Sequence, residues 1–186
     1  MKTRLLALSA LLVSTVFFSC KKESAVQNQK EEEISPSRVD LPGEGCPAKT
    51  VQLTAGQTIN AGSVTVTNDA DFIYVTYTST NGYLLTQTHL YVGNCSTIPV
   101  NNPGNPIPGQ FPYNSNHAYL TTFTYQVPIS AIPQGACGCI AAHAVVVKLN
   151  FSGQVVEQQT GWGQGTVINP NGTSWGMKFE YCSCAL

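Results

Sequence analysis

The chain has 186 residues, only 10% of them are charged, and the formal net charge at pH 7 is −1. This near-neutral balance argues against a nucleic-acid partner, because binding phosphates requires a basic patch. It also argues against electrostatic attraction to a membrane surface. The stretch of about 140 residues from Cys46 onward is long enough for one domain with its own hydrophobic core.

The first twenty residues have the order of features that is typical of an export signal. Lys2 and Arg4 form a short positive region, residues 5–18 are an uncharged apolar run, and the letters FFSC end at Cys20. A run of ~14 residues is too short for the ~20 that span a bilayer as a helix. The small residue before the cysteine resembles the lipobox of bacterial lipoproteins. This resemblance predicts that residues 1–19 are a signal peptide and that Cys20 is lipidated.

Residues 20–45 are expected to be the lipidated cysteine followed by a flexible linker. The segment is rich in charge and almost free of large apolar side chains, so it cannot bury enough surface to offset its ordering entropy. A lipidated Cys20 would anchor the protein in the cell envelope without a membrane helix. We expect the anchor to lie in the outer membrane, and the sequence does not decide between its periplasmic face and its surface face. The alternative is an ordinary secreted protein with an unmodified Cys20.

Residues 46–186 are predicted to form a single all-β domain. Runs of two-residue periodicity, rich in β-branched and aromatic residues, indicate about eight strands separated by Gly, Asn and Pro. The first are KTVQLTAG and the hairpin SVTVTNDADFIYVTYTST, with its turn at residues 68–71. The others are YLLTQTHLYVG, YLTTFTYQVPI, CIAAHAVVVKLN, VVEQQTGW and MKFEYCSC. The expected fold is one antiparallel β-sandwich, jelly-roll-like and linked by disulfides.

Two connections within this domain are unusually long. Residues 93–118 contain five prolines and no clear strand. Loops of this length are mostly functional or disordered, and we expect Phe111, Tyr113 and Tyr119 to anchor this one against the domain. The second loop, TGWGQGTVINPNGTSWG, presents Trp162 and Trp175 among glycines.

Six cysteines follow Cys20, and an even number in an exported protein predicts disulfides. Two Cys-x-Cys segments on neighbouring antiparallel strands would direct their sulfur atoms to one face. The expected bonds are Cys137–Cys184, Cys139–Cys182 and, by elimination, Cys46–Cys95. The alternative is zinc bound by Cys137, Cys139 and His143. It requires thiolates, which an oxidising compartment removes.

Five motifs in a fixed order carry a resemblance that covers residues 49–181. They are VTVTND…IYVTYT, THLYVG, GNPIPGQFPY, CIAAHAVVV and GWGQG. In these motifs the chain resembles a group of uncharacterised secreted β-rich bacterial proteins, which implies no activity. Many members have AWG where this chain has residues 161–163, so the loop here is expected to be freer. The hairpin is also similar to those of carbohydrate-binding modules.

The residues favour binding over catalysis. A glycosidase usually needs two carboxylates that flank the bond, and no pair in the domain is compelling. The domain's acidic residues are Asp69, Asp71, Glu157 and Glu180. The two aspartates are typical of a turn, with Ca²⁺ binding alongside Asn68 as the alternative. The sequence has no Gly-x-Ser-x-Gly elbow and no His-Glu-x-x-His motif. An enzyme whose serine, histidine and acidic residue are distant in sequence but converge in space remains an open alternative.

Three histidines form the candidate site of a metal-dependent enzyme, which is an alternative function. His89, His117 and His143 could hold zinc and leave a position open. His143 is expected to be a core residue with one hydrogen bond and not a metal ligand, because its strand is apolar on both faces and such strands are buried. His89 shares the more polar face of its strand, and His117 is placed in the long loop. We expect no metal and no other cofactor.

Neutral polar side chains and planar aromatic rings suit a neutral, hydroxyl-rich ligand such as a glycan. The candidate ligand-binding residues are Trp162, Trp175, Tyr113, Tyr83, His89 and His117. Trp162, between two glycines, is the aromatic residue most expected to be exposed. The expected function is a lipid-anchored envelope module for binding or adhesion, and the alternative is a structural or protein-interaction lipoprotein. If Trp162 clusters with the aromatic residues of the long loop, a ligand-binding groove is favoured. If they are widely separated, a protein-interaction surface is favoured.

Overall fold

The computed structural model describes residues 46–185, which form an all-β domain. The predicted signal peptide, Cys20 and linker lie outside the described residues. The strands are β1 Lys49–Ala55, β2 Ile59–Asn68, β3 Phe72–Ser79, β4 Leu84–Gly93, β5 Tyr113–Leu120, β6 Thr122–Pro128, β7 Cys137–Leu149, β8 Val155–Gly163, β9 Thr166–Val167 and β10 Met177–Cys182. The 3₁₀ turns are η1 Cys95–Thr97, η2 Pro108–Gln110 and η3 Ile129–Ala131. None of the helical turns in this range is long and apolar enough to cross a membrane.

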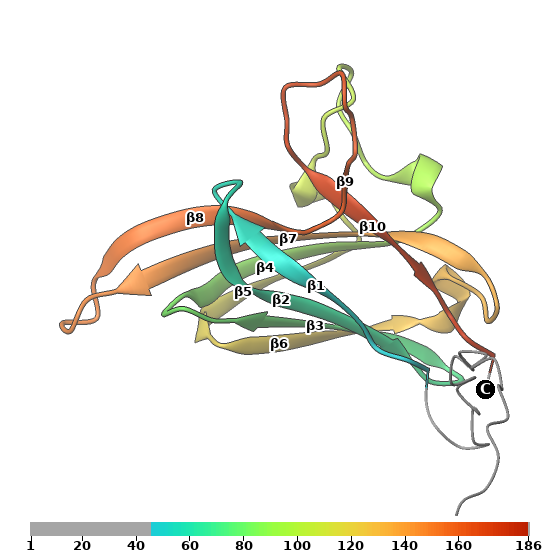
Figure 1. The fold of residues 1–186 in the computed structure, drawn as a ribbon, viewed down its shortest axis with the longest axis horizontal. Coiled ribbons are helices and arrows are strands. Elements are labelled where there is room, and N and C mark those ends of the chain that lie inside the picture. The colour runs from blue at the N-terminus through green and yellow to red at the C-terminus, as the bar shows by residue number, and fades with distance from the viewer. Residues whose placement is uncertain (1–45, 186) are drawn as a thin grey trace, which may run out of the picture. The chain divides into compact units, whose positions relative to one another are not determined.

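Hydrogen bonds join eight strands into one antiparallel sheet in the order β5-β4-β7-β8-β1-β2-β3-β6. The β1–β8 pairing is short, from Leu53 opposite Gly163 to Ala55 opposite Gly161. On either side of it, β4, β7 and β8 form one layer and β2, β3 and β6 form the other (Figure 1). The prediction of an all-β, antiparallel, disulfide-linked fold with about eight strands is therefore confirmed, with the layers belonging to a single, nearly closed sheet.

The main core lies between the two layers and follows from the two-residue alternation of the strands. Val64 on β2, with Ile73, Val75 and Tyr77 on β3, are all 0% exposed, whereas their neighbours in sequence face outward. Each fully buried aliphatic side chain contributes about 1.5–3 kcal/mol to folding. The Tyr77 hydroxyl donates a 3.0 Å hydrogen bond to the carbonyl of His89 and thereby links the two layers through the core.

A second buried cluster lies on the outer face of β4, β7 and β8. It contains Tyr91, Ile98, Phe111, Cys139, Ala141 and Trp162. The loops 94–112 and 164–176 cover it and stand side by side at the top of Figure 1. They are joined by hydrogen bonds from the Asn169 side chain to the Pro103 carbonyl at 2.6 Å and from Asn105 to Thr173 at 3.3 Å. The expectation that Phe111 anchors the long loop is confirmed, because its side chain is 2% exposed.

All six cysteines of the domain form disulfides, but each predicted pairing is wrong. The bonds are Cys46–Cys184, Cys95–Cys139 and Cys137–Cys182. The two Cys-x-Cys strands are neighbours and antiparallel, as expected, yet Cys182 lies opposite Cys137. This register is shifted by two residues from the predicted one. Cys139 is therefore left for Cys95, and Cys184 extends beyond β7 to Cys46.

The long connection also contains a strand that the sequence analysis places in a loop. β5 begins at Tyr113, so His117 is a strand residue and not a loop residue. The strand alternates half-buried with exposed side chains, but most of them are polar, so the pattern lacks an apolar period. At its end, Tyr119 has a φ of 61° and is 46% exposed. Tyr119 is therefore not the packed anchor that the sequence predicts, and it lies where the chain turns into β6.

Candidate functional site

His89 on β4 and His143 on β7 lie directly opposite each other and form a buried pair. Their Nδ1 atoms are 3.2 Å apart, within hydrogen-bonding distance. Trp162 is the next residue in this row, opposite His143 on β8, and its ring packs edge-on with centroids 4.8 Å apart. Burial lowers the pKa of both histidines, that of His143 to about 3, so both rings are neutral at pH 7. The prediction of a buried, hydrogen-bonded His143 is confirmed.

His117 lies on the other side of the sheet from this pair. Its Nε2 atom is 2.8 Å from the hydroxyl of Thr88, which is fully buried and precedes His89 on β4. Successive strand residues point to opposite faces, so His89 and Thr88 project away from each other. Burial lowers the pKa of His117, and its ring packs against Phe123 at 4.3 Å. The three imidazoles of the predicted metal site therefore do not converge.

The expectation that Trp162 is exposed is wrong. Its side chain is 5% exposed and packs against Phe111 and His143. The flanking glycines reflect close packing: a Cβ on Gly161 would lie 2.9 Å from the Thr54 carbonyl oxygen. A Cβ on Gly163 would lie 2.9 Å from the Phe179 ring. Trp162 does cluster with the long loop's aromatics, but they form a packed core and not an open groove.

The other predicted aromatic ligands are dispersed. Trp175 is half-buried over the second cluster, and Tyr113 is half-buried against Tyr125. Tyr83 is 3% exposed, and its hydroxyl donates a hydrogen bond to Glu157. Burial, together with that carboxylate, raises the pKa of Tyr83 to about 12. The candidate aromatics are therefore buried or half-buried and do not form one stacking platform.

Two of the domain's carboxylates, Asp69 and Glu157, have structural roles. Asp69 accepts hydrogen bonds from the backbone N–H groups of Asp71 and Phe72 and from the Tyr74 hydroxyl at 2.6 Å. The Tyr74 bond is the main cause of the lowered pKa of Asp69. This is the plain turn that the sequence analysis favours over a Ca²⁺ site. Glu157 pairs with Lys148 at 3.6 Å and accepts the hydrogen bond from Tyr83.

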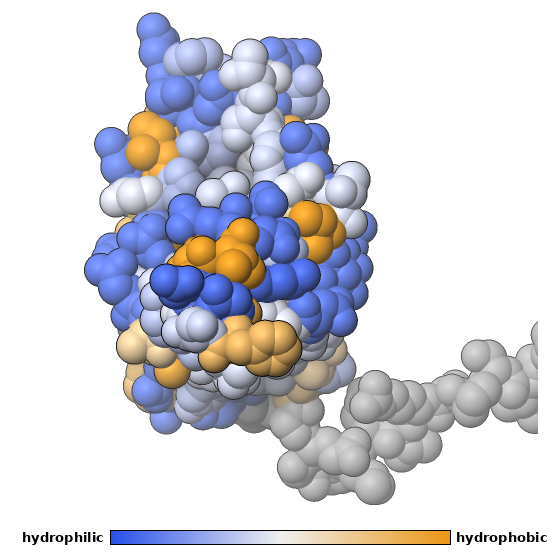
Figure 2. All heavy atoms as spheres, turned by 90° about the vertical axis from the view of Figure 1, so that its left-hand side faces the viewer, coloured by the Kyte–Doolittle hydropathy of each residue, from blue (hydrophilic) through white to orange (hydrophobic). Residues whose placement is uncertain are grey.

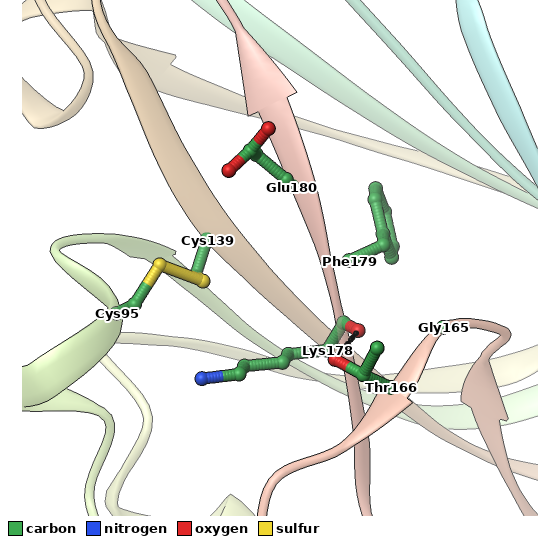
Figure 3. Close-up of a pocket in the computed structure, with 7 residues that line it drawn as sticks. All are labelled: Cys95, Cys139, Gly165, Thr166, Lys178, Phe179 and Glu180. Atoms are coloured by element: carbon green, nitrogen blue, oxygen red, sulfur yellow. Dashed lines mark hydrogen bonds between the residues drawn. A yellow bond between two sulfur atoms is a disulfide. The ribbon is translucent and has the colours of Figure 1, made fainter.

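A groove with a volume of about 470 Å³ lies over the Cys95–Cys139 disulfide. Lys178 and Glu180 project from β10 toward the disulfide, while Phe179 points to the other side (Figure 3). Glu180 also has Cys137 and Cys182 within 4.8 Å, a spacing suitable for metal ligands. These two sulfur atoms bond to each other, so they are not available as thiolate ligands while the disulfide is intact.

An ordered array of hydroxyl groups, not anticipated from the sequence, lies on the outer face of β1, β2, β3 and β6. Backbone register places four threonines opposite one another in a single row across the four strands: Thr50, Thr65, Thr76 and Thr124. The next row contains Gln52, Ser63, Thr78 and Thr122. We call these eight residues the threonine face. All are exposed or half-buried, and none carries a charge.

The hydroxyls of the threonine face retain capacity for a ligand. Thr50 and Thr65 are joined by a 2.9 Å hydrogen bond, and so are Thr76 and Thr124. Each hydroxyl has one donor and two acceptor lone pairs, and the bond within a pair uses one of each. One donor and three acceptor sites therefore remain in each pair. The signal for this face was present in the sequence as the repeats TVT, TYT and TFT, but their alignment depends on strand register.

Comparisons with known proteins identify no relative. No protein-family model matches the chain, and no curated protein or solved structure matches it significantly. The resemblance to secreted β-rich bacterial proteins therefore stays a prediction.

Proposed function

We propose that this protein is a lipid-anchored envelope module that binds neutral glycans through the threonine face. The observation that carries the proposal is the in-register row Thr50, Thr65, Thr76 and Thr124. Anchoring would come from the lipobox-like Cys20, which lies outside the described residues, and the outer membrane is the proposed location. The ligand-binding site differs from the one inferred from the sequence, because Trp162 is buried.

Neutral glycans fit this face by their chemistry. Their hydroxyl groups both donate and accept hydrogen bonds, and the free capacity of the threonine pairs is of the same mixed kind. Neighbouring strands are about 4.8 Å apart, so a row offers hydroxyls at regular intervals across the sheet. The face offers no cation to attract an acidic polysaccharide or a nucleic acid. A neutral, hydroxylated chain is therefore the occupant that this surface favours.

The test is a binding assay with the full chain, exported so that its disulfides form. Neutral glucan, mannan and xylan would be compared with an acidic alginate by affinity electrophoresis. In the test variant, Thr65, Thr76 and Thr124 are all replaced by Val, which keeps the shape and strand preference but removes the hydroxyls. The matched control is Thr160→Val, which removes an exposed hydroxyl from β8 in the other half of the sheet.

The proposal expects retention by at least one neutral polysaccharide and weak retention by alginate. At about 1 kcal/mol for each lost hydrogen bond, the triple variant should bind at least roughly tenfold more weakly. Thr160→Val should bind like the unmodified protein. Equal binding by the triple variant, or no retention by any neutral polysaccharide, would contradict the proposal.

A protein-interaction role is the second candidate, and the β7–β8 hairpin favours it. Phe151 at its tip is fully exposed, and Val155 and Val156 beside it are 47% and 63% exposed. Figure 2 looks onto the side of the domain toward which this hairpin extends, and it shows hydrophobic patches bordered by hydrophilic side chains. Cross-linking of intact cells through a photoreactive residue at position 151 would test this role. A discrete adduct with an envelope protein would support it, and no adduct would contradict it.

A further inference from the structure

The two nitrogen atoms of the histidine pair have the separation of two ligands of one metal ion. His89 and His143 present their Nδ1 atoms to each other at 3.2 Å. Two nitrogens bound to one ion at 2.0–2.1 Å would be about 2.9 Å apart at the right angle of a tetragonal copper(II) site and about 3.3 Å apart at the angle of a tetrahedral zinc site, and the observed separation lies within this range. The two residues are directly opposed on hydrogen-bonded strands, so the backbone of the sheet holds the rings at this separation.

The state of the two rings suits metal binding. A metal ligand must be a neutral imidazole, and both rings are buried without an acidic partner in their hydrogen bond. In the metal-free pair, one Nδ1–H donates to the other Nδ1. For both Nδ1 atoms to bind a metal, the donor ring moves that proton to its Nε2 through solvent. The metal then replaces the hydrogen of the Nδ1···Nδ1 bond, with no net gain or loss of protons.

The surroundings orient the pair and place a polar neighbour on one side of it. Trp162 packs against His143, and Phe111 packs against Trp162 from the long loop, so His143 is held from β8. His89 is 9% exposed, and its partner on β5 is the exposed Asn114. The side of the pair toward β5 is therefore polar, and water there would complete the coordination sphere of a bound ion.

From this geometry we propose that His89 and His143 bind one divalent transition-metal ion, with copper(II) preferred over zinc(II). The preference for copper follows from imidazole ligation and the order of stability of first-row divalent metals. The site lies outside the threonine face and does not depend on glycan binding. It also differs from the predicted three-histidine site, because His117 lies on the other face of β4.

Trp162 makes the proposal directly measurable, since copper(II) bound to the pair would quench its fluorescence. The experiment titrates copper(II) alone into the untagged full chain that carries Trp175→Phe, so that emission reports Trp162, the other of the two tryptophans. The same titration is repeated with His89→Gln, with His143→Gln and with His117→Gln as the matched control. Near-UV circular dichroism before the titration shows whether each variant keeps its aromatic packing. Electron paramagnetic resonance then counts the nitrogen ligands.

The proposal expects quenching that saturates at one equivalent of copper, with a spectrum that shows two nitrogen ligands. Loss of a ligand should weaken binding by at least about 100-fold in His89→Gln and in His143→Gln, because loss of an outer-shell partner alone typically costs about 10–100-fold, while His117→Gln binds like the parent. If His143→Gln does not fold, His89→Gln alone decides the question. Quenching that is absent, or that persists unchanged in His89→Gln, would overturn the site and leave a simple hydrogen-bonded histidine pair.

Discussion

Phe111 packs edge-on against Trp162, with ring centroids 6.2 Å apart, and thereby joins the long loop to β8. Tyr91 on β4 also packs edge-on against Phe111, with centroids 6.1 Å apart. Edge-to-face aromatic pairs add about 0.5–1.5 kcal/mol to the burial of their surface. The proline-rich connection is thus anchored near its end by Phe111, in addition to the Cys95–Cys139 disulfide near its start.

Replacing Phe111 with Ala should therefore destabilise the domain. Removal of a buried phenylalanine leaves a cavity and typically costs about 3–5 kcal/mol of the free energy of unfolding. Chemical denaturation followed by tryptophan fluorescence would measure this loss. The matched control is Phe151→Ala, because Phe151 is fully exposed on the β7–β8 hairpin and its removal should change stability by less than about 0.5 kcal/mol. Equal stabilities of the two variants would contradict the packing of the long loop.

Gly62 is predicted to be irreplaceable by Ala. It lies on β2 with a φ of 148°, and a Cβ there would be only 1.9 Å from the carbonyl oxygen of Thr78 on β3. Because the obstacle is backbone, relief requires the β2–β3 pairing to move, and we expect a loss of at least about 2 kcal/mol. Gly109→Ala is the control, since its Cβ would meet open space. Thermal unfolding of both variants measures the difference.

Acid should destabilise the domain through His143. The pKa of His143 is lowered from 6.5 to about 3 in the folded state, so the unfolded chain binds more protons as the pH falls. The contribution of neutral His143 to the free energy of unfolding is complete above pH 6.5 and is lost as the pH falls toward 3. By pH 5 the loss amounts to about 2 kcal/mol. Burial lowers the pKa of His89 and His117 as well, with the same sign.

Urea denaturation at pH values from 7.5 to 5.0 would measure this dependence in the unmodified protein and in His143→Gln. The variant should show a flatter decline of stability with falling pH, whatever its stability at pH 7.5. This window lies above the pKa range of Asp69 and Glu157, whose pKa values are lowered from 3.8 and 4.5. The same slope in both proteins would show that His143 is not the buried titrating group.

The disulfide Cys46–Cys184 should be the most stabilising of the three, because it closes a sequence separation of 138 residues. In the chain-entropy treatment, a loop of that size contributes up to about 5 kcal/mol. Replacing both cysteines with Ser should lower the denaturation midpoint by a corresponding amount. Peptide mapping without reduction should recover the Cys46–Cys184 peptide from the unmodified protein. Recovery of Cys46 linked to Cys95 instead would support the pairing inferred from the sequence and contradict the structure.

The wrong disulfide pairing and the missed threonine face share one cause, which is strand register. A shift of two residues between β10 and β7 leaves every side chain on the same face, so periodicity cannot distinguish Cys182 opposite Cys137 from Cys182 opposite Cys139. The threonine face was missed for the same reason. β2, β3 and β6 each show a Thr-x-Thr repeat, but only the pairing of Thr65 with Thr76 and of Thr76 with Thr124 makes a row.

The error at Trp162 has a different origin. Glycines on both sides of a tryptophan suggest a free loop when read locally. In the fold, Gly161 and Gly163 allow Thr54 and Phe179 to approach closely, which no local signal reveals. His117 was misplaced because β5 is an edge strand of polar residues, whose burial comes from its neighbours and not from its own apolar pattern.

The sequence by itself determined the all-β class, most of the strands, the turn at Asp69, the burial of His143 and the participation of all six cysteines in disulfides. These properties depend on local alternation, turn chemistry and composition, which a chain carries wherever it folds. Only the tertiary structure decided which cysteines pair, that His89 meets His143 while His117 does not, and that the threonines align. Such relationships depend on register between distant strands, because a strand's pattern specifies the face of a side chain but not its partner.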